Sequence, residues 1–208
     1  MKNLLTIVLS VASMLAPAQT MRQLWVSMPD SIVPYLTESN RTELADYVDM
    51  QMEAVIQNQL KDTTRMRVLK SSYIDVELSA ASRLQMKLLP WSGAETDTLL
   101  CVVTTLRGPA PASRIVFYDR RWQPVAVESP LSTVDASTFV VRPDSLSDAT
   151  YEELLALLRP VMVALELSPA DDGLIIRASL PPMTRDEKAR LEPFLVQRKL
   201  KWNGRKFN

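Results

Sequence analysis

The chain has 208 residues, of which 47% are hydrophobic and 23% charged, and its 24 basic residues balance its 24 acidic ones. This is the composition of a folded globular protein, and the lack of net positive charge argues against a protein built to hold nucleic acid or an anionic membrane surface. The chain contains no histidine. That excludes Ser-His-Asp and Cys-His catalysis, histidine-ligated zinc, and any side chain that titrates near neutrality without a shifted pKa.

The first 18 residues predict a secretory signal peptide. Lys2 precedes an apolar run over residues 4–15, and Ala16-Pro17-Ala18 supplies small residues two apart before Gln19. Because the apolar run is shorter than the ~18 residues of a spanning helix, we favour a cleaved signal over a retained anchor. Cleavage leaves about 190 residues with 23 basic and 24 acidic side chains. We expect this mature part to contain no membrane span and to work in the periplasm or outside the cell.

Helical spacing and then strand alternation mark the first part of the mature chain. Apolar residues recur every three or four positions over 21–28, and again from about 37–40 to about 60, which predicts two helices. Alternation over 65–79 predicts one half-buried strand or a strand with a central irregularity, and alternation over 84–88 predicts its neighbour. The next strands are expected at 98–107, buried on both faces, at 114–118 and at 122–125.

Residues 128–147 are rich in Ser, Thr and Asp, contain two prolines, and predict a linker, within which Phe139-Val140-Val141 could add a short edge strand. Beyond this linker, a helix is expected to open at 144–147, and Thr184 is expected to cap another, with Glu187 at capping-box spacing. Asn203-Gly204 favours a hairpin turn that returns the chain beside its last strand. The strands of this part are expected at 161–167, 174–180 and 196–202.

This element order predicts an α+β fold of antiparallel sheets with helices packed on one face. We expect an N-terminal helix-plus-sheet subdomain at 19–127 and a C-terminal one at 148–208. The two could be diverged repeats, since 29–31 and 143–145 both read Pro-Asp-Ser, although chance explains a tripeptide better. Regular βαβ alternation is absent from the sequence, which disfavours a parallel nucleotide-binding sheet.

No motif in the sequence assigns a reaction, a metal or a cofactor. The four glycines are too far apart for a phosphate-binding loop, and Asp171-Asp172-Gly173 fits a turn better than a calcium loop. Glu152-Glu153 fits the first turn of a helix, where negative charge complements the dipole. Cys101 lies in an apolar run and is expected to be a buried thiol. We therefore assign no catalytic, cofactor-binding or metal-binding residue.

The remaining candidates for function are surface contacts. Basic residues near the C-terminus are interleaved with aromatic ones, and two earlier tryptophans lie next to turn residues, where a ring could stack on a sugar. The alternative is that the basic residues form the solvent face of a terminal strand and that the tryptophans pack in the core. The candidate partner-binding residues are Trp91, Trp122, Lys199, Lys201, Trp202 and Arg205.

Short stretches at both ends of the mature chain resemble a known family. The stretches are Met21-Arg22-Gln23-Leu24-Trp25, Met28-Pro29-Asp30-Ser31, Pro34-Tyr35-Leu36, Asn40-Arg41 with Glu43-Leu44, and the ending Trp202-Asn203-Gly204-Arg205-Lys206-Phe207. They are similar to a DUF3256-like family of uncharacterised exported proteins from Bacteroidales. The resemblance implies a Gram-negative export route, hence the periplasm or cell envelope. It implies no catalytic residues, because the family has no assigned activity.

Together these observations favour a non-catalytic exported envelope module that binds a protein or glycan partner. The alternative is a hydrolase that acts on a cell-wall or dietary polymer through two carboxylates ~5 to 10 Å apart. A structural or inhibitory protein that docks onto one target through a sheet edge or concave face is equally compatible with the sequence. Two facing acids in an aromatic-lined cleft would favour the hydrolase, and a flat or convex apolar patch would favour the binding module.

Overall fold

The computed structural model describes residues 19–92 and 97–208, so the predicted signal peptide at 1–18 lies outside the described residues. The described helices are α1 (Met21–Val26), α2 (Glu38–Asp49), α3 (Asp148–Leu157) and α4 (Arg185–Leu191). The described strands are β1 (Val55–Gln57), β2 (Thr63–Leu69), β3 (Tyr73–Ser79), β4 (Ser82–Pro90), β5 (Thr98–Leu106), β6 (Ala112–Tyr118), β7 (Met162–Leu167), β8 (Gly173–Ser179) and β9 (Arg198–Lys201).

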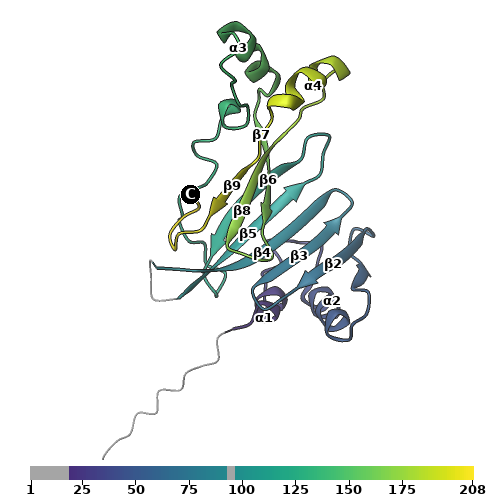
Figure 1. Ribbon diagram of the computed structural model, residues 1–208. Coiled ribbons are helices and arrows are strands. Elements are labelled where there is room, and N and C mark those ends of the chain that lie inside the picture. Colours follow the sequence, from purple (N-terminus) through teal and green to yellow (C-terminus); the bar gives the residue numbers. More distant parts are fainter. Residues whose placement is uncertain (1–18, 93–96) are drawn as a thin grey trace, which may run out of the picture.

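The strands form two antiparallel sheets (Figure 1). β1 to β6 follow one another in chain order across a six-stranded sheet, and β7, β8 and β9 form a three-stranded sheet. The smaller sheet packs against β4, β5 and β6 of the larger one through β7. The α+β class predicted from the sequence is confirmed.

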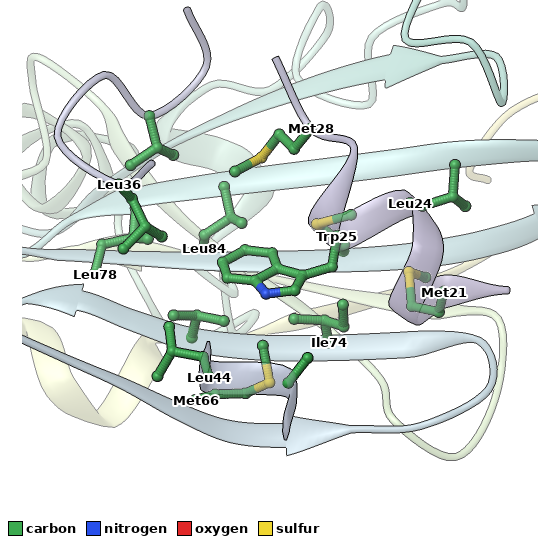
Figure 2. Close-up of a cluster of buried hydrophobic side chains, with 14 of the residues drawn as sticks. Met21, Leu24, Trp25, Met28, Leu36, Leu44, Met66, Ile74, Leu78 and Leu84 are labelled. Carbon is green, nitrogen blue, oxygen red and sulfur yellow. The ribbon is translucent and has the colours of Figure 1, made fainter. Parts of the chain in front are cut away.

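One face of the six-stranded sheet is covered by α1 and α2, which enclose a first core (Figure 2). Trp25 of α1 is fully buried, and its indole Nε1 donates a hydrogen bond of 2.8 Å to the carbonyl oxygen of Arg41 in α2. The Arg41 side chain is itself buried and donates to the carbonyl oxygens of Val26 and Leu36. The sheet supplies alternate side chains to this core: Met66, Ile74, Val76, Leu78, Leu84, Met86, Leu100 and Val102.

The opposite face of the same sheet encloses a second core with the three-stranded sheet. The large sheet contributes Tyr73, Leu89, Leu99, Cys101, Val103 and Phe117, and β7 and β8 contribute Leu165, Leu167, Leu174 and Ile176. Within the expected linker at 128–147, Ala136, Phe139 and Val140 are buried in this core. β5 thus places Leu100 in one core and Leu99 in the other, which confirms the strand predicted to be buried on both faces.

Three local signals are confirmed. Thr184 and Glu187 form the predicted capping box at the start of α4, and the Ser147 side chain caps α3 by accepting from the Thr150 backbone N–H. At the chain end, Trp202 pairs with Phe207 across the predicted hairpin turn. Each of these signals acts within a few residues of the sequence, which is why the sequence pattern was sufficient.

The helix expected to reach about residue 60 is wrong beyond Asp49, because the chain leaves the helix through a Schellman motif. Gln51 lies in the left-handed region at φ 57°. Its N–H donates to the Val48 carbonyl oxygen, and the Met52 N–H donates to the Tyr47 carbonyl oxygen. Glycine usually occupies the left-handed position, so glutamine gave no stop signal. Val55 and Ile56, which continue the helical spacing in the sequence, belong to β1 instead.

The single strand expected at 65–79 is also wrong, since these residues form β2 and β3 of a hairpin. The turn at 70–72 contains no Gly, Pro, Asn or Asp, and Met66 before it faces the same core as Ile74 and Val76 after it, so the sequence pattern shows no break. The strand expected at 122–125 is reduced to one bridge between Tyr118 and Pro124, because proline has no N–H to extend a ladder. The edge strand expected at 139–141 is likewise one bridge, between Val140 and Leu195.

Candidate functional site

Two of the candidate residues, Trp91 and Trp202, meet in an aromatic cluster with Phe117 and Phe207. The ring centroid of Trp202 lies 6.0 Å from that of Trp91, 5.7 Å from Phe117 and 5.1 Å from Phe207. The Trp202 indole is 9% exposed, and its Nε1 donates a hydrogen bond of 2.5 Å to the Pro90 carbonyl oxygen. The cluster anchors the end of the chain to β4 and β6.

Trp122 lies apart from this cluster, in the first core. It is 7% exposed, and its ring centroid is 5.3 Å from that of Tyr118. Its backbone has a φ of 63°, in a turn organised by the Asp119 carboxylate, which accepts from the backbone N–H groups of Arg121 and Gln123. Little of the Trp122 ring is therefore accessible to a ligand.

The three basic candidates lie along β9 and the turn that follows it. Lys199 and Lys201 are exposed and alternate with Leu200, which packs against the second core. Arg205 is exposed in the turn between Trp202 and Phe207. Strand alternation therefore presents the lysines to solvent and buries the intervening apolar side chain.

A groove of about 370 Å³ runs beside β9, and we call it the β9 groove. Its lining comes from three separate parts of the chain together with Ile176 of β8. The lining residues are 128–130, 132–134 and Thr138 of the segment before α3, 198–200 of β9, and 206–208 at the chain end. Apolar side chains of Val134, Leu200 and Phe207 are thus combined with hydroxyl and charged groups, a mixture typical of recognition sites.

Polar contacts join the walls of the β9 groove. Arg198 Nε donates a hydrogen bond of 2.9 Å to the Thr138 carbonyl oxygen, and Lys206 Nζ lies 2.7 Å from a Glu128 carboxylate oxygen. Lys199 Nζ lies 2.7 Å from a carboxylate oxygen of Asp171, in the turn between β7 and β8. The hydrogen bonds from Lys199 and Ser168 lower the pKa of Asp171 to about 2. Among the side chains of the lining, three are cationic and one is a carboxylate.

Three further properties of the described residues concern metal binding, the thiol and membrane spans. These residues include no group of three or more His, Cys, Asp or Glu side chains placed to hold a metal ion. Cys101 is fully buried, and its burial raises the pKa of the thiol. No helix in the described ranges is both long and apolar enough to cross a bilayer.

The comparisons with known proteins agree with the fold and leave the activity open. A family model described as "Protein of unknown function (DUF3256)" matches residues 13–207. The chain belongs to this family. Among solved structures, this DUF3256 chain is similar to the "Structure of a domain of an uncharacterized protein from Porphyromonas gingivalis W83". The two share 25% sequence identity with a TM-score of 0.73, over 89% of this chain and 96% of the other. No curated protein matches the DUF3256 chain.

Sequence reasoning located one strand of the β9 groove in this DUF3256 chain and missed the opposite wall. Lys199 is a candidate because it belongs to the basic residues that are interleaved with aromatic ones near the C-terminus. The wall at 128–134 was interpreted as linker, and its contact with Lys206 joins residues 78 positions apart. The possible edge strand at 139–141 was the one local signal that this segment lies beside the C-terminal strand.

Proposed function

We propose that this DUF3256 protein is a non-catalytic module of the cell envelope that binds a protein partner in the β9 groove. The observation that carries the proposal is the groove itself, in which three separate segments bring apolar and charged side chains to one concavity. Protein interfaces combine an apolar centre with a polar rim in the same way. The Arg198 contact with Thr138 and the Lys206 contact with Glu128 hold this shape before any partner binds.

A protein partner suits this lining better than a glycan. Stacking on a sugar ring needs an exposed aromatic face. Phe207 is the one aromatic residue among the described lining residues, and it is 6% exposed. Trp202 is turned into the second core behind it. A glycan would therefore find hydroxyl and charged groups here but little aromatic surface.

The test of this function is loss of partner binding when the groove is filled. Thr133→Trp places a large side chain on the groove wall, and Ser39→Trp places the same side chain on the exposed surface of α2 as a matched control. We expect wild-type protein and Ser39→Trp to capture the same envelope protein by cross-linking, and Thr133→Trp to lose it. Capture by all three proteins would place the partner site elsewhere.

A glycan array and an assay for turnover of envelope polymers complete this test. A hydrolase of the expected kind needs two carboxylates facing each other. The β9 groove holds one, Glu128, and Lys206 engages it. Turnover of a cell-wall polymer by the purified protein, with no captured protein and no glycan bound, would overturn the binding function.

The envelope location is a separate part of the proposal. It rests on the pattern of residues 1–18, with a cationic start, a short apolar run and small residues before Gln19. We expect the mature protein in the periplasmic or extracellular fraction to begin at Gln19. Mass spectrometry of fractionated cells measures this directly, and an intact amino terminus in the cytosolic fraction would contradict it.

A further inference from the structure

The outer edge of the C-terminal strand is paired at both ends and open between them. Before β9, Leu195 bridges to Val140, and the Val196 N–H donates to the Phe139 carbonyl oxygen at 2.9 Å. At its end, Lys201 and Asn208 exchange two backbone hydrogen bonds of 2.8 and 3.0 Å. Among the described residues, no backbone partner is recorded on this edge for residues 197–200.

The backbone of Lys199 faces this opening. Residues of an antiparallel strand direct their N–H and C=O groups alternately to one neighbour and the other. Trp202 donates its N–H to Asp172 on the β8 side, whereas Lys201 bonds outward to Asn208. By the same alternation, the N–H and C=O of Lys199 point outward, into the β9 groove that Lys199 lines. An open strand edge of this kind is a template for pairing with another chain.

The charge beside the open edge is positive. Residues 198–206 carry five cations, and two of them, Lys199 and Lys206, have carboxylate partners. Within the described residues, no carboxylate pairs with Arg198, Lys201 or Arg205. An added strand would therefore have Lys199 and Lys201 on its solvent face, and the apolar side chains of Leu200 and Phe207 beneath it.

We propose that the β9 groove binds an extended segment of a partner protein as an added β-strand, with acidic residues alternating with apolar ones. This inference rests on the proposed function and specifies how that site is used. Main-chain hydrogen bonds to Lys199 supply affinity, and alternate side chains supply specificity. The acidic side chains face Lys199 and Lys201, and the apolar ones face the second core on the side of Leu200.

Synthetic peptides test the strand pairing with the protein unchanged. The probe is a fluorescein-labelled heptapeptide of alternating glutamate and valine with blocked ends, measured by anisotropy at low salt. One derivative is N-methylated on all glutamate amides and another on all valine amides, because these two sets point to opposite edges of a strand. We expect one derivative to bind about tenfold more weakly and the other to bind as the parent does. Equal binding by both derivatives would overturn the inference, as would no binding by the parent peptide.

Charge and the Lys199 backbone are tested by substitution and by a second peptide. An alternating lysine and valine peptide is expected to bind at least about tenfold more weakly than the glutamate peptide. Lys199→Gln removes the charge and keeps the backbone N–H, so it should lower the affinity for the glutamate peptide about threefold. Lys199→Pro also removes the backbone N–H from the outer edge, where proline is tolerated, and should lower the affinity for the glutamate peptide at least about tenfold. Equal affinities of these two variants would contradict pairing to Lys199.

The outcomes separate this inference from the proposed function. If the synthetic peptides do not bind as expected but Thr133→Trp still abolishes partner capture, the groove binds its partner by another mode, and only the added strand is refuted. If Thr133→Trp leaves capture unchanged while the peptides bind as expected, the strand site exists but is not the site of the captured partner. If both fail, neither the groove nor its open edge serves in binding. A thermal unfolding curve for Lys199→Pro confirms that the variant is folded.

Discussion

At the scale of single residues, Lys87 of β4 links the two sheets with its charged end. It is 3% exposed, and its Nζ donates to the carbonyl oxygens of Ser168 at 2.8 Å and Asp171 at 2.7 Å, in the turn between β7 and β8. The Asp172 carboxylate lies 3.8 Å away. Burying an ammonium group costs free energy unless hydrogen-bond acceptors surround it. In turn, the contacts with Lys87 orient the turn that contains Asp171, the carboxylate that pairs with Lys199.

We expect Lys87→Met to destabilise the protein by about 3 kcal/mol, because it leaves two carbonyl oxygens without their charged donor. Methionine preserves most of the packing along the side chain, so the loss reports on the hydrogen bonds. Urea unfolding measures it, with Lys201→Met at an exposed position of β9 as the control. A loss no larger than that of the control would show that Lys87 does not stabilise the contact between the sheets.

Asp171 provides a prediction about pH. Its hydrogen bonds from Lys199 and Ser168 lower its pKa from the ordinary 3.8 to about 2. Because the folded value is the lower one, the unfolded chain takes up this proton first, and the stabilisation is complete above about pH 5 and lost as the pH falls towards about 2. We expect the difference in Tm between wild type and Asp171→Asn to shrink over that range.

Thermal unfolding from about pH 7 to about pH 2 measures this difference. Asp144→Asn is the control, because Asp144 is exposed and makes no recorded ion pair within the described residues. A difference that persists unchanged at the acidic end would mean that the Lys199 contact does not act through the charge of Asp171.

At the scale of elements, the turn after β9 positions one part of the groove lining. Gly204 has a φ of 93°, and a Cβ atom there would lie 2.6 Å from Ser92 Oγ. The Ser92 side chain can move, but the left-handed backbone remains strained for any other residue. This turn returns Phe207 beside Trp202 and allows Asn208 to pair with Lys201.

We expect Gly204→Ala to cost about 1 to 2 kcal/mol of stability and to weaken binding of the glutamate and valine peptide. Gly108→Ala is the matched control, because a Cβ there would meet its nearest recorded neighbour at an ordinary 3.8 Å. Urea unfolding and anisotropy measure the two effects. Equal stability of the two variants would show that the turn at Gly204 accepts a side chain.

Helix ends and strands differ in how far they could be predicted from the sequence. The caps at Ser147 and Thr184 were predictable because a side chain and its target N–H lie three residues apart. The end of α2 was not, since Gln51 takes a conformation that glycine usually signals. For the groove, the interleaving of basic and aromatic residues near the C-terminus identified Lys199, but the opposite wall depends on contacts such as that between Arg198 and Thr138, 60 positions apart.

At the scale of the whole molecule, the six-stranded sheet is a middle layer shared by two cores. Neighbouring residues of β5 enter opposite sides, Leu99 towards the small sheet and Leu100 towards α1 and α2. The small sheet closes its core against β4, β5 and β6, so neither core is complete without the central strands. We infer that both sides lose their packing when those strands separate.

We therefore expect the two cores to unfold in one transition, despite the two subdomains expected at 19–127 and 148–208. Leu99→Ala and Leu100→Ala should each cost about 3 kcal/mol, as large-to-small changes at buried sites do. Hydrogen exchange at increasing urea, followed by mass spectrometry, reports α1 and α2 separately from β7 and β8. Both variants should lower the urea midpoint of unfolding by the same amount in the fragments from α1 and α2 and in those from β7 and β8. If Leu99→Ala lowered it only for β7 and β8, the C-terminal part would be an independent unit, and the β9 groove could open without disturbing the helices.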